Sequence, residues 1–133
     1  MRLLCAFLLS LSALLSGDLC SSNLLRSIVD ETKNELNPPV RLDEMTLLID
    51  VRCMQNALTY FYMLDLNDAD MQFFANPSTK QAFEEELNTN NTEQYCNNED
   101  ISWFRENNVP MRWRYFLKEN LYMDIQKSPK DCL

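Results

Sequence analysis

The stretch MTLLIDVRCMQNALTYFYML, residues 45–64, decides the fold. From residue 45 to residue 54, apolar side chains at the odd-numbered positions alternate with a mixed set of polar and apolar side chains at the even-numbered positions. This is the two-residue period of a β-strand. Gln55-Asn56 interrupts the alternation, and residues 57–64 resume it with aromatic and apolar side chains that suit a strand. Two such runs separated by a pair of turn-forming residues predict a β-hairpin.

Residues N-terminal to this hairpin have the spacing of an amphipathic helix. Five apolar side chains fall on one helical face: Leu24, Leu25, Ile28, Val29 and Leu36. Asp18 or Ser21 can cap the start of this helix. Asn37-Pro38-Pro39 ends it, because proline lacks an amide N–H and pushes the preceding residue out of the helical region.

Residues 65–108 are polar and predict helices, and the chain then returns to strand spacing. We expect a short helical turn from Asp68 and a helix capped by Ser78, with Phe83 and Leu87 facing inward. That helix should break or fray at residues 88–91, and Asn98 can cap a last short helix. Residues 111–117 and 121–126 then predict a second hairpin.

The expected element order is therefore α-β-β-α-β-β. It predicts an α+β fold in which a four-stranded antiparallel sheet, arranged as a meander, has helices packed on one face. No repeat or linker interrupts residues 18–133, so we expect them to form a single domain.

The first 17 residues have the pattern of a secretory signal peptide. Arg2 precedes an apolar run from residue 3 to residue 15, and Ser16-Gly17 supplies small residues before the polar chain begins. A membrane-spanning helix needs about 20 apolar residues, so this run predicts cleavage after Gly17 rather than an anchor. A lipoprotein is the alternative, because Cys20 follows closely, although Leu19 is bulky for the residue before a lipidated cysteine. We expect a periplasmic or secreted protein.

Composition excludes several function classes. The chain has 133 residues, a net charge of −8, no histidine and one glycine. A Ser-His-Asp or Cys-His site and a histidine-ligated metal centre all require histidine. A phosphate-binding loop requires several glycines. An acidic chain is also poorly matched to nucleic acid or an anionic membrane. We expect no cofactor and no metal.

Removal of the signal peptide leaves four cysteines: Cys20, Cys53, Cys96 and Cys132. Four cysteines in a small exported chain predict two disulfides, for which three pairings are possible. We favour Cys20–Cys53 with Cys96–Cys132, since each pair links an early to a late part of one half of the chain. Free thiols are the alternative, and a zinc site has little support because no C-x-x-C pair is present.

Two segments resemble a group of small exported bacterial proteins of undefined function. One is the run from Asn56 to Tyr62, which follows an alternating strand, and the other is the run from Val109 to Phe116, which follows a cysteine and a short helix and precedes a terminal Asp131-Cys132. The resemblance covers most of residues 24–132. It implies a signal peptide, a helix, two hairpins, a Cys96–Cys132 disulfide and a bacterial periplasmic location. It supplies no catalytic residues.

Three acidic or polar motifs do not predict a functional site. Residues 65–70 superficially resemble a calcium loop, but Ala69 and Asp70 replace the ligand and the glycine that the loop requires. Glu84-Glu85-Glu86 could supply paired carboxylates for acid–base chemistry, yet consecutive helical residues point in different directions. Asn90-Asn91-Thr92 is a glycosylation sequon that matters only in a eukaryotic source.

The predicted sheet has two unlike faces. We expect one face to pack beneath the helices with Met45, Leu47, Ile49, Leu58, Tyr60, Tyr62, Trp113, Tyr115, Leu121, Met123 and Ile125. The other would carry Leu48, Arg52, Met54, Phe61, Met63, Arg112, Arg114, Phe116 and Tyr122. Arginine, aromatic residues and methionine are enriched at protein interfaces. Structural explanations compete, because a helix could cover this face, or Asp50 and Asp124 could neutralise the arginines across the strands.

We therefore interpret the chain as a non-catalytic exported protein that binds an envelope or secreted protein, or a second copy of itself. Seven residues are the predicted contacts: Arg52, Phe61, Met63, Arg112, Arg114, Phe116 and Tyr122. The alternative is a small envelope hydrolase that uses carboxylates alone. Such an enzyme needs two carboxylates about 5–10 Å apart across a cleft, and the sequence singles out no such pair.

Overall fold

A computed structural model describes residues 18–133; the expected signal peptide, residues 1–17, lies outside them. The helical elements in chain order are η1 (Leu19–Ser21), α2 (Asn23–Leu36), α3 (Asp68–Ala75), α4 (Pro77–Asn97), η2 (Glu99–Ile101), α5 (Ser102–Glu106) and η3 (Pro129–Cys132). The strands are β1 (Val40–Arg41), β2 (Thr46–Met54), β3 (Ala57–Leu64), β4 (Met111–Leu117) and β5 (Asn120–Lys127).

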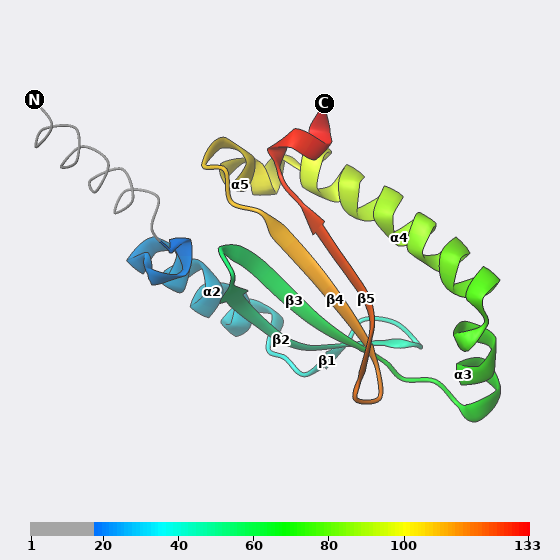
Figure 1. Ribbon diagram of the computed structural model, residues 1–133. Coiled ribbons are helices and arrows are strands. Elements are labelled where there is room, and N and C mark those ends of the chain that lie inside the picture. The colour runs from blue at the N-terminus through cyan, green and yellow to red at the C-terminus, as the bar shows by residue number, and fades with distance from the viewer. Residues whose placement is uncertain (1–17) are drawn as a thin grey trace, which may run out of the picture.

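The strands form one five-stranded mixed sheet in the order β1-β2-β3-β4-β5 (Figure 1). The predicted α+β class is confirmed, and so are the hairpins β2–β3 and β4–β5. The expected four antiparallel strands are wrong in two respects. The two-residue strand β1 pairs with β2, and β3 pairs with β4 in parallel.

The parallel pair follows from the length of the connection between β3 and β4. Two parallel neighbours need a crossover of a dozen or more residues, which is usually helical. Residues 65–110 supply it through α3, α4, η2 and α5. Figure 1 shows α4 running back along the β4–β5 hairpin, so that β4 starts at the same end of the sheet as β3. A meander would instead need a short connection at that point.

The expected break in α4 at residues 88–91 is also wrong, because the helix continues to Asn97. Tertiary contacts outweigh the low helix propensity of asparagine and threonine here. Asn88 Oδ1 accepts a 2.5 Å hydrogen bond from Lys127 Nζ on β5. Asn91 and Tyr95 are buried against the rest of the fold. These contacts with distant elements hold both ends of the polar segment in the helix.

The β2–β3 turn shows how a chain with a single glycine makes tight turns. Gln55 and Asn56 both have positive φ, 49° and 63°, which is the left-handed conformation that two-residue hairpin turns require. Asn37 and Asn108 adopt it where helices end. Asparagine tolerates this region better than other non-glycine residues, so it takes the usual place of glycine.

Two β-bulges change which face of the sheet the neighbouring side chains occupy. Register shifts lie between Leu48 and Asp50 in β2 and between Tyr115 and Phe116 in the β4–β5 pair. An inserted residue reverses the alternation beyond it. Leu48 is therefore buried at 1% exposure, and Ile49 is exposed at 41%. The expected placements of these two side chains are wrong for this reason, and so is that of Leu121, which is 45% exposed.

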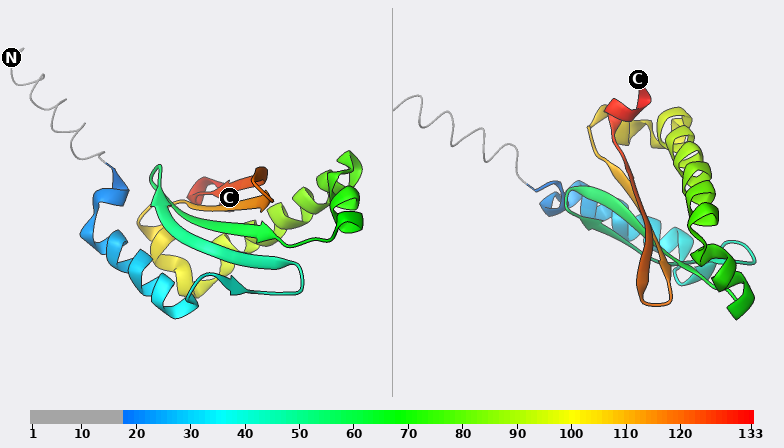
Figure 2. Two further views of the ribbon diagram at one scale, coloured as in Figure 1. Left: turned by 90° about the horizontal axis from the view of Figure 1, so that it is seen from below. Right: turned by 45° about the vertical axis from the view of Figure 1, so that its right-hand side comes forward.

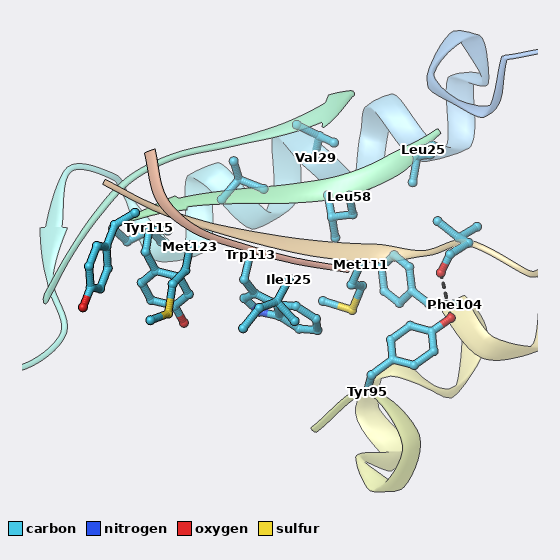
Figure 3. Close-up of a cluster of buried hydrophobic side chains, with 14 of the residues drawn as sticks. Leu25, Val29, Leu58, Tyr95, Phe104, Met111, Trp113, Tyr115, Met123 and Ile125 are labelled. Carbon is cyan, nitrogen blue, oxygen red and sulfur yellow. Dashed lines mark hydrogen bonds between the residues drawn. The ribbon is translucent and has the colours of Figure 1, made fainter. Parts of the chain in front are cut away.

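The buried side of the sheet and the helices form one hydrophobic core. Figure 3 shows Met111, Trp113 and Tyr115 of β4 projecting to the same side as Met123 and Ile125 of β5. α2 contributes Leu25 and Val29 to this core, while α4 contributes Tyr95 and α5 contributes Phe104. The sheet is strongly twisted, so β4–β5 crosses β2–β3 steeply (Figure 2).

Tyr95 connects the helical crossover to the start of β4. Its side chain is fully buried, and its hydroxyl donates a 2.9 Å hydrogen bond to the carbonyl oxygen of Val109 (Figure 3). Arg105 Nη1 donates to the carbonyl of Tyr95 at 2.7 Å. The end of α4, α5 and the first residues before β4 are therefore tied together by one buried and one partly buried hydrogen bond.

Two disulfides join the cysteines in the expected pairing. Cys20–Cys53 links η1 to β2, and Cys96–Cys132 links the end of α4 to η3. The sulfur of Cys20 is bonded to Cys53, so in this structure it does not carry the thioether of a lipoprotein.

Replacing Tyr95 by phenylalanine should destabilise the fold by about 1–3 kcal/mol, because the buried carbonyl of Val109 would lose its donor. Urea denaturation followed by circular dichroism measures this change. Tyr60→Phe, at a partly buried tyrosine of β3, is the matched control and should have a smaller effect. Equal changes in the two variants would contradict the role given to the Tyr95 hydroxyl.

Candidate protein-binding face

The structure brings six of the seven predicted contact residues together on one face of the sheet. We call the set Arg52, Phe61, Met63, Arg112, Arg114 and Phe116 the arginine face. Strand register places them, because Phe61 lies opposite Arg114 and Met63 lies opposite Phe116 in the parallel pair. Thr59 of β3 lies between Arg52 and Arg112 in the same row and is fully buried beneath this face.

Tyr122, the seventh predicted contact, lies elsewhere. The bulge in the β4–β5 pair turns it toward α3 and α4, where it is only 9% exposed. Its hydroxyl donates a 2.5 Å hydrogen bond to the carbonyl of Phe74, and its ring lies 6.4 Å from that of Phe83. The expected position of Tyr122 beside the arginines is therefore wrong.

Arginines and phenylalanines alternate across the arginine face. The guanidinium carbon of Arg52 lies 5.3 Å from the centre of the Phe61 ring. The guanidinium carbon of Arg114 lies near two rings, 5.8 Å from the centre of Phe61 and 5.6 Å from that of Phe116. The two phenylalanine rings are stacked with centres 6.3 Å apart. These cation–π contacts hold the guanidinium groups of Arg52 and Arg114 close to apolar surface.

Asp124 of β5 is the main counter-ion of this face. Arg112 donates to both oxygens of its carboxylate, with Nε 2.7 Å from Oδ1. The hydrogen bond from Arg112 holds the pKa of Asp124 below its usual value, and the same bond raises the pKa of Arg112. Arg112 Nη1 also donates to Gln55 Oε1 at 2.8 Å. Arg112 is thus a fully engaged structural group.

Asp50 performs a similar role at the β2 side of the face. Its carboxylate lies 2.6 Å from Arg52 Nε and 3.3 Å from Lys33 Nζ of α2. Although burial raises the pKa of Asp50, hydrogen bonds from Arg52 and the Val51 amide lower it on balance. The expectation that an aspartate neutralises an arginine across the strands is confirmed for Asp124 and Arg112, whereas Asp50 pairs with Arg52 of its own strand and with Lys33 of α2.

Arg114 is different from the other two arginines. Its Nε lies 3.8 Å from Asp124 Oδ2, beyond hydrogen-bonding distance, and finds no hydrogen-bond partner among residues 18–133. The Arg114 side chain is nevertheless only 22% exposed, because it lies against the rings of Phe61 and Phe116. The structure therefore presents a guanidinium group that is held against two aromatic rings and meets its counter-ion only at 3.8 Å.

The acidic motifs do not form a comparable site. Glu84 and Glu85 line a hollow of about 540 Å³ beside Asp124, but the Asp124 carboxylate is already bound by Arg112. In residues 65–70, α3 begins at Asp68, and Asp65 forms an ion pair with Arg41 at 2.7 Å. Within the described chain, no three acidic or cysteine side chains are grouped to hold a metal ion. No helix of residues 18–133 has the length and apolar character to cross a membrane.

Sequence reasoning missed the contacts of two residues. Gln55 was interpreted only as part of a turn, although it contacts Arg112 across 57 positions of the chain. Asn91 was expected to break α4 and is instead buried at 5% exposure. The only available signal for Asn91 was its four-residue spacing from Leu87 and Tyr95, which places the three on one helical face.

Comparison with known proteins identifies the fold but no family. No protein-family model and no curated protein matches the chain. The chain is similar in structure to a Pseudomonas aeruginosa protein inferred to be secreted, with a TM-score of 0.63, 11% identity, and coverage of 88% of this chain and 100% of that one. It is also similar to a pilotin of the Vibrio vulnificus type 2 secretion system, with a TM-score of 0.53, 13% identity, and coverage of 81% and 94%.

Replacing Asp124 by asparagine should destabilise the fold near neutral pH and have little effect in acid. The pKa of Asp124 is lowered in the folded state, so its stabilising contribution is present above the unfolded value of about 4 and is lost as the pH falls below that value. Urea midpoints of both proteins between pH 7 and pH 2.5 measure the difference. Asp30→Asn, at an exposed position of α2, is the matched control. A difference that stays constant with pH would contradict this assignment.

Proposed function

We propose that this chain is an exported, non-catalytic protein that binds another protein through the arginine face. The observation that carries the proposal is Arg114, whose partly exposed guanidinium group lies against the Phe61 and Phe116 rings and meets its counter-ion Asp124 only at 3.8 Å. A guanidinium group fixed in this way loses little conformational entropy when a carboxylate binds it. Arginine and aromatic anchors of this kind dominate the energy of many interfaces.

The chemistry of the face defines the partner. Three guanidinium groups stand against the two carboxylates of Asp50 and Asp124, in a chain whose net charge is −8. Met63, Phe61 and Phe116 supply partly exposed apolar surface beside the arginines. The complementary surface is an acidic side chain, placed to meet Arg114, with apolar residues around it.

Location and partner class have separate support. Two disulfides favour an oxidising compartment such as the periplasm or the exterior of the cell. The structural likeness to a protein inferred to be secreted agrees with this location. The likeness to a pilotin makes a component of an envelope secretion system the first class of partner to test.

The alternative, a carboxylate hydrolase, gains no specific support from the geometry. Its general acid would need a carboxyl group whose pKa is raised toward neutrality. Among the carboxylates that line the hollow beside β5, Asp124 has a pKa that Arg112 lowers. Turnover of glycan fragments that a single Asp or Glu substitution abolishes would restore the hydrolase hypothesis.

The test uses the oxidised mature chain as bait for the envelope fraction of its source. Arg114→Glu should lose the partner that the wild-type chain retains, because it places a carboxylate against the partner's acidic group. Increasing salt should weaken the wild-type interaction. Quantitative mass spectrometry of the retained proteins measures both effects.

Two controls make the result specific. Arg26→Glu changes the same charge on the exposed surface of α2 and should retain the partner. A compensating Glu→Lys or Asp→Lys change in the captured partner should restore binding to Arg114→Glu. Identical retention by Arg114→Glu and wild type, with both proteins folded, would overturn the proposal. Recovery of the chain itself as the retained protein would identify self-association.

A further inference from the structure

The outer edge of strand β5 is a second surface, separate from the arginine face. β5 is the last strand of the sheet and pairs with β4 alone in the part of the chain that the structure describes. An edge strand presents alternate backbone N–H and C=O groups that no neighbouring strand satisfies. From Met123 to Lys127 the pairing with β4 is regular, because the register shift lies before this segment. The segment offers about 14 Å of regular strand edge.

A hollow of about 540 Å³ lies along this edge, between β5 and α4. On the strand side it is lined by three consecutive residues, Asp124, Ile125 and Gln126. Neighbouring residues of a strand point to opposite faces of the sheet, so three consecutive residues have in common the backbone edge. Figure 1 and the right-hand view of Figure 2 both show α4 beside β5. The hollow therefore opens onto the backbone of β5 rather than onto one face of the sheet.

The helix side of the hollow carries negative charge. It is lined by Gln81, Glu84, Glu85 and Asn88 of α4. Both glutamates are exposed, and neither forms an ion pair among residues 18–133. Lys127, the cation at the end of β5, donates its hydrogen bond to Asn88 instead. A cationic group is the electrostatic complement of this side of the hollow.

These features define the occupant. An extended peptide can pair with an exposed strand edge through its main chain, while its alternate side chains supply specificity. A second copy of this chain is disfavoured, because pairing β5 with β5 would bring two acidic helix surfaces together. We propose that β5 accepts an extended, basic segment of another protein as a sixth strand. Its main chain pairs along residues 123–127, and its lysine or arginine side chains at alternate positions face Glu84 and Glu85. This surface is distinct from the arginine face, whose partner group is acidic.

The test is a titration of the folded, oxidised chain with a synthetic peptide, followed by two-dimensional ¹H–¹⁵N NMR and amide hydrogen exchange. The probe is acetyl-Thr-Lys-Thr-Lys-Thr-Lys-Thr-amide, which has β-branched residues and alternate cations. It should produce saturable shifts at residues 123–127 and slow the exchange of those amides that point away from β4. A dissociation constant of about 1 mM is expected, because a flexible peptide loses conformational entropy when it binds.

Two control peptides separate main-chain pairing from charge. The same peptide with every backbone nitrogen methylated keeps its lysines but cannot donate hydrogen bonds to a strand, so it should not slow exchange in β5. The counterpart with glutamate in place of lysine keeps the main chain and should bind more weakly, because it meets the acidic side of the hollow.

Variants of α4 test the charge from the protein side. Glu84→Gln combined with Glu85→Gln should weaken binding of the lysine peptide about fivefold, since two exposed ion pairs are lost. Glu86→Gln combined with Glu93→Gln is the matched control, because it removes two exposed carboxylates of the same helix that do not line the hollow. Arg114→Gln should bind the peptide as wild type does, so failure here is distinguishable from failure of the arginine face.

Three outcomes would overturn the proposal. The first is the absence of saturable shifts at residues 123–127 with the lysine peptide. The second is equal slowing of exchange by the methylated peptide, because main-chain pairing would then have no part in binding. The third is slowed exchange of the same amides that rises with protein concentration in the absence of peptide, which would assign the edge to a second copy of the chain.

Discussion

The parallel pairing of β3 with β4 is the constraint on which the rest of the structure depends. It joins the two antiparallel hairpins at the centre of the sheet, and it can form only if the chain crosses from one end of the sheet to the other between them. The long helix α4 makes this crossing and then remains as the cover of the sheet. The buried hydroxyl of Tyr95 and its bond to Val109 set where the crossing ends and β4 begins. The same pairing places Phe61 beside Arg114 on one face and Tyr62 beside Tyr115 on the other.

Local patterns predicted most elements of the fold, and long-range contacts decided their arrangement. Alternation at residues 45–64 and 111–126 predicted both hairpins, since side-chain period depends only on neighbouring residues. The direction in which the second hairpin joins the first depends on whether residues 65–110 return across the sheet, and no local period encodes that. The continuity of α4 through Asn88 depends on Lys127, which lies 39 positions away in the chain. Strand β1 is only two residues long and leaves too short a pattern to detect.

The arginine face was predictable for a similar reason, and its exceptions have a single cause. Strict alternation placed six of the contact residues correctly because no bulge lies between them and the centre of the sheet. Leu48, Ile49, Leu121 and Tyr122 were misplaced because each lies at or beyond an inserted residue near an outer strand. The distinction between Arg112, which is hydrogen-bonded to Asp124, and Arg114, which is only ion-paired with it at 3.8 Å, requires atomic geometry. The burial of Asn91 requires it too, because asparagine in a sequence carries no mark of burial.

The positions of the disulfides have a topological consequence. Cys20–Cys53 closes a loop over α2, β1 and β2, while Cys96–Cys132 closes another over α5, β4 and β5. Residues 54–95 belong to neither loop, and neither crosslink spans the junction of β3 with β4. A single cut of the backbone at Leu66, between β3 and α3, would leave two separately crosslinked fragments held together only by strand pairing and the shared core. A cut within either loop would leave one covalently connected molecule.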